Sequence, residues 1–298
     1  MTGSVLFDAP GPRTVARHRI YGVVTVIAIL AGVVGLVAFM DAEGELAYAK
    51  WEQFVTPKYV EALLVDGLLK TLQMAFTSIV LAVVFGVVFG VGKLSDHRPV
   101  RWACTLVVEF FRAVPVLLLM IFIFFSWGVG NGFGPYWSVV FALTLYNGSV
   151  LAEVFRAGVL AVPKGQAEAA YAIGMRKTQV MNLVLLPQAV KIMLPAIISQ
   201  CVVALKDTSL GYYIIAPGLT YIGKAMWTEF PGTHLQTAIV LSFLYISVNL
   251  VLTAIATWVQ RRFVGEHRRL DVGMTALTGL STHGENTGGA AGIGPGSA

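Results

Sequence analysis

The feature that most constrains this chain is a series of apolar runs, each about as long as a helix that crosses a bilayer. A backbone in lipid must satisfy its own hydrogen bonds, and the alternating pattern of a membrane barrel is absent, so each run is predicted to be helical. We therefore expect an all-α fold, a polytopic transmembrane helical bundle of about six spans. The predicted spans are Tyr21–Met40, Leu68–Gly92, Ala103–Trp127, Trp137–Ala157, Lys191–Ala216 and Leu235–Val259.

Composition supports a membrane domain. Only 12% of the 298 residues are charged and 56% are hydrophobic, whereas an ordinary soluble domain carries about a quarter charged residues. The net charge of +5 does not indicate nucleic acid, because the basic residues are scattered between the apolar runs. Cys104 and Cys201 are too few for a disulfide framework or a four-ligand metal cluster.

The distribution of Lys and Arg predicts which side each loop faces. Basic loops near span ends tend to stay in the cytoplasm, and a cytoplasmic N-terminus places most of the 21 Lys and Arg on that side. We expect a multi-pass protein of the cell membrane with both termini cytoplasmic. The lysines expected on the outer side are Lys50, Lys58, Lys70 and Lys224.

The first apolar run, the acidic segment after it and the C-terminal tail all lie outside the later five spans. Tyr21–Met40 follows three arginines, as a secretory signal core does, but it exceeds the usual ~7 to 15 residues and no convincing cleavage site follows, so we expect a retained anchor. The acidic segment Asp41–Gly67 contains aromatic residues and is predicted to form a helix on the outer membrane surface, with contact to an external partner as the alternative. The tail from Asp271 is rich in Gly, Ser, Thr and Ala, which predicts disorder.

The chain contains no convincing motif for nucleotide or catalytic chemistry. Gly218–Lys224 has the Walker spacing, but Ala225 follows it where a magnesium-binding Ser or Thr is needed, and no strand precedes it. The five histidines are dispersed over loops and tails, with no pairing suited to a metal or a general base. We expect no enzyme activity, no metal and no cofactor in this chain, so energy for transport must come from a partner or an ion gradient.

The longest polar cytoplasmic loop, 158–190, carries the most specific pattern. Ala167–Ile173 contains good helix formers, and Gly174 is placed to end that helix in a left-handed cap. A short helix with small residues and one carboxylate, held off the membrane, suits docking into a groove on another protein. In full the pattern reads Glu168-Ala169-Ala170-x3-Gly174-x9-Val184-x-Leu186-Pro187.

This spacing resembles the EAA signature of ABC importer permeases, although the family usually has Ile where Val184 stands. The resemblance implies a type I ABC importer permease fold, in which the motif helix transmits the movement of a separate ATPase to the membrane helices. Glu168 would make polar contacts there, and the small residues would allow close approach. The residues assigned to ATPase coupling are Gly165, Gln166, Glu168, Ala169, Ala170, Gly174, Leu186 and Pro187.

Flanking motifs narrow the resemblance to permeases for polar amino acids, the histidine, glutamine and glutamate uptake family. With its extra N-terminal span, the chain is most similar to actinobacterial glutamate-uptake permeases, which implies glutamate as solute. The resemblance covers Gly67 to about Phe263, and Arg112-Ala113-Val114-Pro115 departs from the usual Arg-Gly-Thr-Pro. The matching residues are Gly67, Thr71, Glu153-x-x-Arg156-x-Gly158, Gly165-Gln166, Pro187-Gln188-Ala189, Pro195 and Lys206-Asp207-Thr208-Ser209-Leu210.

The implied organisation has four parts: a cytoplasmic tail (1–20), an extra span with an external segment (21–66), a permease domain (67–263) with its coupling loop (158–190), and a cytoplasmic tail (264–298). The implied partners are a cytoplasmic ABC ATPase dimer that uses ATP and magnesium, a second permease, and an extracytoplasmic amino-acid-binding protein. Two other classes stay open: an ion-coupled secondary amino-acid transporter and a membrane scaffold without a transport role.

Charged residues inside the apolar runs are candidates for the solute path. Charges at the bilayer centre cost about 2.5 to 3.5 kcal/mol each on insertion scales, so they normally face a cavity or a partner. The predicted pathway residues are Lys206, Asp207, Thr208, Ser209, Leu210 and Arg112. A structural ion pair that braces helices is the alternative for Lys206 and Asp207, and snorkelling to the cytoplasmic face is the alternative for Arg112.

Two further spacings concern packing. Glu153 and Arg156 lie three residues apart on one helix face, which predicts a structural ion pair. Gly86 and Gly90 form a small-xxx-small surface that lets another helix approach closely. That helix belongs either to this chain or to a second permease.

Overall fold

The computed structural model describes residues 12–130 and 132–264, and within these ranges every regular element is helical. Five helices are long and apolar enough to cross a bilayer, or six if one bent pair counts as a single span. The expected all-α bundle of about six spans is therefore confirmed. The predicted disorder from Asp271 and the first part of the predicted tail, 1–11, lie outside the described residues.

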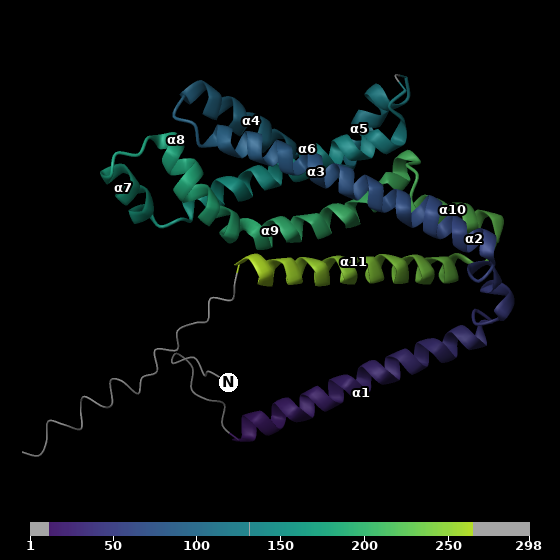
Figure 1. Cartoon of the computed structure of the whole chain (residues 1–298). Helices are drawn as coiled ribbons and strands as arrows, with labels where there is room; N and C mark the ends of the chain where they lie inside the picture. Colours follow the sequence, from purple (N-terminus) through teal and green to yellow (C-terminus); the bar gives the residue numbers. More distant parts are fainter. Residues whose placement is uncertain (1–11, 131, 265–298) are drawn as a thin grey trace, which may run out of the picture.

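The first half of the chain carries the long helices α1, α3 and α6 (Figure 1). In chain order its elements are α1 (Pro12–Ala42), two 3₁₀ turns η1 (Tyr48–Lys50) and η2 (Glu52–Phe54), α2 (Pro57–Glu61), a π-helical stretch η3 (Ala62–Leu69), α3 (Lys70–Lys93), α4 (Arg98–Ala113), α5 (Val116–Ile123), a second π stretch η4 (Phe124–Gly128) and α6 (Gly134–Leu160).

The second half begins with short elements and contains two long helices, α9 and α11. Its elements are α7 (Lys164–Ala172), α8 (Lys177–Gln179), the π stretch η5 (Val180–Leu185), α9 (Leu186–Asp207), the 3₁₀ segment η6 (Thr208–Ile214), α10 (Leu219–Glu229) and α11 (His234–Val264). Figure 1 places α7 and α8 at one end of the bundle and α2 and α10 at the other.

The pair α3 and α6 forms the centre of the bundle, because glycines let the two backbones approach closely. A Cβ added to Gly90 would lie 2.9 Å from the carbonyl oxygen of Ala152 and 2.9 Å from the Cβ of Phe155. A Cβ on Gly86 would lie 2.7 Å from that of Leu151. The small-residue surface of α3 is therefore occupied by α6 of the same chain, which removes it as a face for a second permease.

The third predicted span, Ala103–Trp127, is broken. Helix α4 meets the α5–η4 helix at an angle of 99°. Pro115 has no N–H to donate, and its ring forces the preceding Val114 into extended backbone (φ −81°, ψ 126°). A proline inside an apolar helix favours a kink because it frees a backbone carbonyl, and here the chain turns through about a right angle.

The main buried cluster lies where α3, α5, α6 and η6 meet. Met74, Met120, Leu143 and Ile214 are almost completely buried there. Leu119, Met120 and Ile123 of α5 follow Pro115 and belong to this cluster, so the bend directs α5 into the core while α4 runs along α3.

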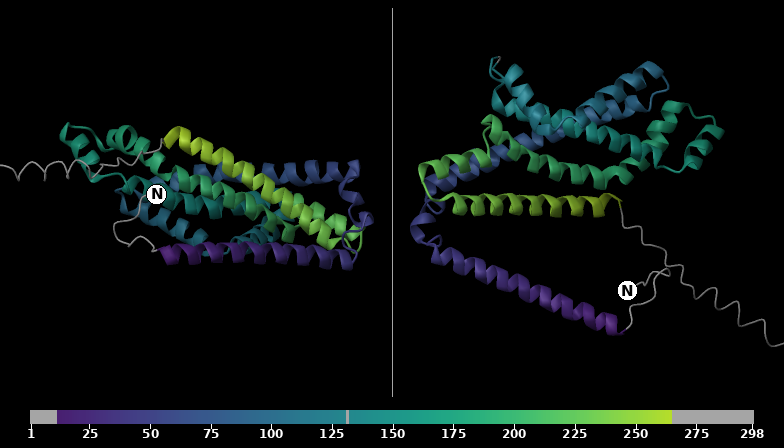
Figure 2. Two further views of the ribbon diagram at one scale, coloured as in Figure 1. Left: turned by 90° about the horizontal axis from the view of Figure 1, so that it is seen from below. Right: turned by 180° about the vertical axis from the view of Figure 1, so that it is seen from behind.

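Helix α1 stands apart from this bundle. Almost all of its described residues are exposed, and Figures 1 and 2 show it diverging from the other long helices. The turn that follows it is attached to the bundle, because Gln236 Nε2 of α11 donates to the carbonyl oxygen of Glu45 at 2.7 Å. The expected surface helix over Asp41–Gly67 is wrong: the segment forms turns and short 3₁₀ pieces, and from Pro57 it already belongs to the second long helix.

Candidate functional site

The short helix α7 is an exposed element at one end of the bundle. It begins after Pro163 and ends before Gly174, whose φ of +82° is the left-handed value predicted for a helix cap. Met175 N–H donates to the carbonyl oxygen of Ala170 at 3.2 Å and closes the cap. The predicted helix at 167–173 is present and begins about one turn earlier, at Lys164.

The side chains of α7 divide into one inward residue and an exposed surface. Ala170 is buried inside the loop, so it is not available for the close approach of a partner that the motif implies. Glu168 and Ala169 are exposed, as are the bulkier Tyr171 and Ile173, the latter at 79%. Large apolar side chains that remain exposed beside a carboxylate are typical of a docking surface.

Helix α7 is connected to the bundle through both of its neighbours. Residues 161–163 join it to α6, and Val162 packs against Ala189 and Met193 of α9. Gln188 of α9 donates to the side-chain oxygen of Gln166 at 3.4 Å. A force on α7 therefore acts on the ends of α6 and α9 together.

The segment after α7 also reaches the turn between α3 and α4. Lys177 donates to Asp96, and this hydrogen bond holds the pKa of the Asp96 carboxyl below its usual range. Both side chains are exposed, so water screens the pair.

The predicted ion pair of α6 is formed, and it is part of a larger set of charges. Arg156 Nε donates to Glu153 at 2.9 Å. Lys93 of α3 donates to the same Glu153 and, at 3.2 Å, to Glu109 of α4. Arg112 lies 3.3 Å from Glu109, which places it in this set and away from Lys206.

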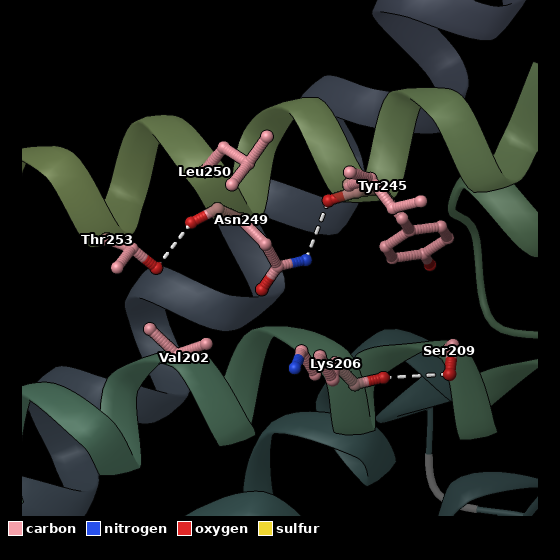
Figure 3. A pocket seen from close by; sticks show the side chains of 8 residues that line it. Val202, Lys206, Ser209, Tyr245, Asn249, Leu250 and Thr253 are labelled. Carbon is pink, nitrogen blue, oxygen red and sulfur yellow. Dashed lines mark hydrogen bonds between the residues drawn. The ribbon is translucent and has the colours of Figure 1, made fainter. Parts of the chain in front are cut away.

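A second polar site lies between α9 and α11, where a groove of about 460 Å³ opens (Figure 3). Lys206 sits in the last turn of α9, nearer the end of the long helix than its middle, and Ser209 follows in η6. Tyr245, Asn249 and Thr253 line the facing side of α11. The remaining lining residues are apolar: Val202, Ile246 and Leu250.

The side chain of Asn249 carries a hydrogen-bond acceptor that has no donor within the described ranges. Its side-chain nitrogen donates to the carbonyl oxygen of Tyr245 at 2.7 Å, as Figure 3 shows. Its side-chain oxygen is buried and accepts no hydrogen bond from any described residue. A buried acceptor without a donor costs about 1 to 3 kcal/mol of free energy. A hydrogen-bond donor that reached this oxygen would recover that cost. Lys206 and Asn249 therefore place a cation and an unpaired acceptor on the two sides of the groove, with the acceptor oxygen below its surface.

The structure does not bring all predicted pathway residues into this groove. Asp207 is half-buried, does not line the groove and forms no ion pair with any described residue. Thr208 is buried and donates to the carbonyl oxygen of Leu205 at 2.6 Å. Leu210 lines a neighbouring hollow with Ser209 and Tyr245.

Sequence reasoning missed the contribution of α11. Asn249 interrupts the apolar run Leu235–Val259, and an amide in the middle of a span is a signal that points to a polar contact. Asn147 of α6 is a second such residue, and it accepts a hydrogen bond from Gln200 of α9.

The chain is similar in sequence to known membrane transport proteins. Residues 82–265 match the family described as binding-protein-dependent transport system inner membrane component. The glutamate transport system permease protein GluD of Corynebacterium glutamicum is 39% identical over 237 residues, which are 78% of this chain and 86% of that protein. The glutamate/aspartate import permease protein GltK of Escherichia coli is 29% identical, over 67% of this chain and 92% of that protein.

Solved structures of ABC transporters are similar to this chain in fold. A crystal structure of an amino acid ABC transporter with histidines has a TM-score of 0.63 and 26% identity, over 68% of this chain and 95% of that chain. An inward-facing MetNI methionine ABC transporter has a TM-score of 0.60 at 22% identity and supports the fold alone, over 70% of this chain and 99% of that chain. The resemblance read from the sequence is thus confirmed, and the chain belongs to the family of binding-protein-dependent transport system inner membrane components.

Proposed function

We propose that this chain is the membrane-spanning permease subunit of an ATP-driven importer for a polar amino acid, with glutamate as its solute. The observation that carries the proposal is the exposed helix α7, which joins the ends of α6 and α9 at one end of a membrane bundle. The names of the relatives, permeases for glutamate and for glutamate and aspartate, support the choice of solute.

In the assembled importer, α7 would lie in the cytoplasm and receive the movement of a separate ATPase dimer. The described ends of the chain, near residues 12 and 264, lie on the same side of the molecule as α7 (Figure 1), so both termini would be cytoplasmic. Arg261 and Arg262 close the last turn of α11 on that side, as the positive-inside rule favours. ATP and magnesium would be bound by the ATPase and not by this chain.

The groove between α9 and α11 would contact the solute. Lys206 would attract a carboxylate, and the free oxygen of Asn249 would accept a hydrogen bond from the α-ammonium group. These two groups suit an anionic zwitterion. A second permease subunit would complete the path, and an extracytoplasmic binding protein would deliver the solute at the end formed by α2 and α10.

The test is reconstitution of the permease with its ATPase and its binding protein in proteoliposomes. We expect glutamate uptake that requires ATP and that unlabelled glutamate inhibits more strongly than glutamine or arginine does. Uptake that continues without ATP, driven by an ion gradient, would contradict the proposal and favour a secondary transporter.

Glu168 provides the matched variants. Glu168→Lys places a cation on the exposed face of α7 and is expected to abolish ATP-driven uptake while the protein remains inserted, whereas Glu168→Gln keeps the size and polarity of the side chain and is expected to retain part of the uptake. Wild-type uptake by Glu168→Lys would show that α7 is not the contact with the ATPase.

A further inference from the structure

Five charged side chains form a series of alternating sign across three helices, at the same end of the bundle as α7. Lys93 of α3 is at its centre, with 6% of its side chain exposed. On one side Lys93 donates to Glu109 of α4, which accepts from Arg112. On the other side it donates to Glu153 of α6, which accepts from Arg156.

Each of the two carboxylates also has a partner on its own helix, an arginine three residues later, whereas in the described part of the chain Lys93 pairs only with residues of other helices. Glu109 and Arg112 form one local pair, and Glu153 and Arg156 form the other. Such local pairs hold no two helices together. Lys93 is therefore the sole ionic connection between α4 and α6 within the described residues.

The position of this connection matters because α6 leads directly into α7. Three residues, 161–163, separate the end of α6 from the start of α7. Movement of α7 thus passes through this short connection into α6, which carries Glu153. Helix α4 is connected to α7 along the chain only through α5 and α6, and the turn before its start at Arg98 reaches the segment after α7 through the exposed Asp96–Lys177 contact.

We propose that Lys93 is a positioning residue that transmits movement from α6 to α3 and α4, so that the bend at Pro115 and the core beyond it follow α7. The inference rests on the proposed function, because it assigns a path to the movement that the ATPase would impose. Lys93 is almost fully buried, so its attraction to Glu153, whose side chain is 19% exposed, is screened little by water, whereas its attraction to the 54% exposed Glu109 is screened more.

Lys93→Met is the informative change. It removes the bridge and keeps a long side chain that fills the same space, while Glu109 and Glu153 each retain an arginine partner. The variant is therefore expected to insert and assemble. Because packing alone then connects α4 to α6, the solute moved per ATP hydrolysed is expected to fall about tenfold, with ATP hydrolysis itself near the wild-type rate.

Two controls separate transmission from folding. Lys93→Arg restores a cation that reaches both carboxylates and is expected to recover most of the uptake per ATP. Lys70→Met makes the same chemical change at the other end of α3, where the lysine forms no ion pair with any described residue, and is expected to leave the ratio unchanged.

The experiment measures ATP hydrolysis and ATP-driven uptake in the same proteoliposomes of the full complex. An unchanged ratio in Lys93→Met would overturn the inference, and so would loss of the variant from the membrane, because Lys93 would then be needed for folding. Failure of the wild-type complex to show ATP-driven uptake would instead refute the proposed function.

Discussion

At the scale of single residues, the groove between α9 and α11 shows how a membrane helix positions a charge. Lys206 stands where α9 ends and η6 tightens into a 3₁₀ helix, and the first side chains of η6 turn back onto the chain: Ser209 Oγ donates to the carbonyl oxygen of Lys206 at 2.7 Å. The lysine is exposed in the groove and forms no ion pair with a described residue. An intramembrane cation in this setting is a candidate for contact with an anion.

Replacement of Lys206 by methionine tests that contact. A hydrogen bond to a charged group contributes about 1.5 to 3 kcal/mol, so the apparent affinity for glutamate in the assembled complex is expected to fall about tenfold or more. Affinity for glutamine, which lacks the side-chain charge, should fall less. The control is Lys191→Met near the other end of α9, and equal effects of the two variants would argue against a role of Lys206 in solute binding.

Replacement of Asn249 tests the side of the groove that α11 forms. Asn249→Leu fills similar space but removes the free acceptor, and we expect weaker competition by amino acids with an α-ammonium group and little change for analogues in which that nitrogen is acetylated. Counterflow competition in proteoliposomes measures this difference. A uniform loss for both kinds of compound would indicate a packing defect instead.

At the scale of elements, the contact of α3 with α6 decides how tightly the bundle packs. Gly90→Leu introduces a side chain whose Cβ would lie only 2.9 Å from a backbone oxygen and a side-chain carbon of α6. Overpacking of this kind costs about 1 to 3 kcal/mol, which lowers the thermal midpoint of the detergent-solubilised protein. Gly35→Leu in α1 is the control, since a Cβ there would have no atom within 4 Å in the described part of the chain.

The turn between α3 and α4 has a pH-dependent contact with α8. Because Lys177 holds the pKa of Asp96 below its unfolded value, the contact contributes stability that is fully present above the ordinary aspartate pKa of 3.8 and is lost as the pH falls through the lowered value. Hydrogen exchange of residues 177–185 should differ between wild type and Asp96→Asn at neutral pH. The difference should vanish in the acid range; a difference that vanished already near pH 6 would contradict the assignment.

At the scale of the whole molecule, α1 is an addition to a bundle that packs without it. None of the three buried clusters in the described part of the chain contains a residue of α1, and the turn at Glu45 that binds Gln236 of α11 lies beyond residue 42. The truncated protein is expected to keep its fold, with a thermal midpoint within about 4 °C of the full chain. Loss of monodisperse protein on truncation would show that α1 stabilises the bundle in the membrane.

Local features were predictable from the chain because they depend on neighbours in sequence. The apolar runs, the helix before Gly174, the pair of Glu153 with Arg156 and a kink at Pro115 all follow from residues a few positions apart. The predicted surface helix before Gly67 failed because residues from Pro57 onward join the long helix that continues through α3.

The sequence by itself determined that this chain is a membrane bundle and where the short helix α7 lies, since hydrophobicity, helix caps and helix spacing act over one or two turns. Only the tertiary structure decided which helix covers Gly86 and Gly90, that Ala170 faces inward, and that Lys93 lies between Glu109 and Glu153. It also decided that Asn249 faces Lys206 across a groove. These relations join residues tens of positions apart, and the packing of whole helices determines them.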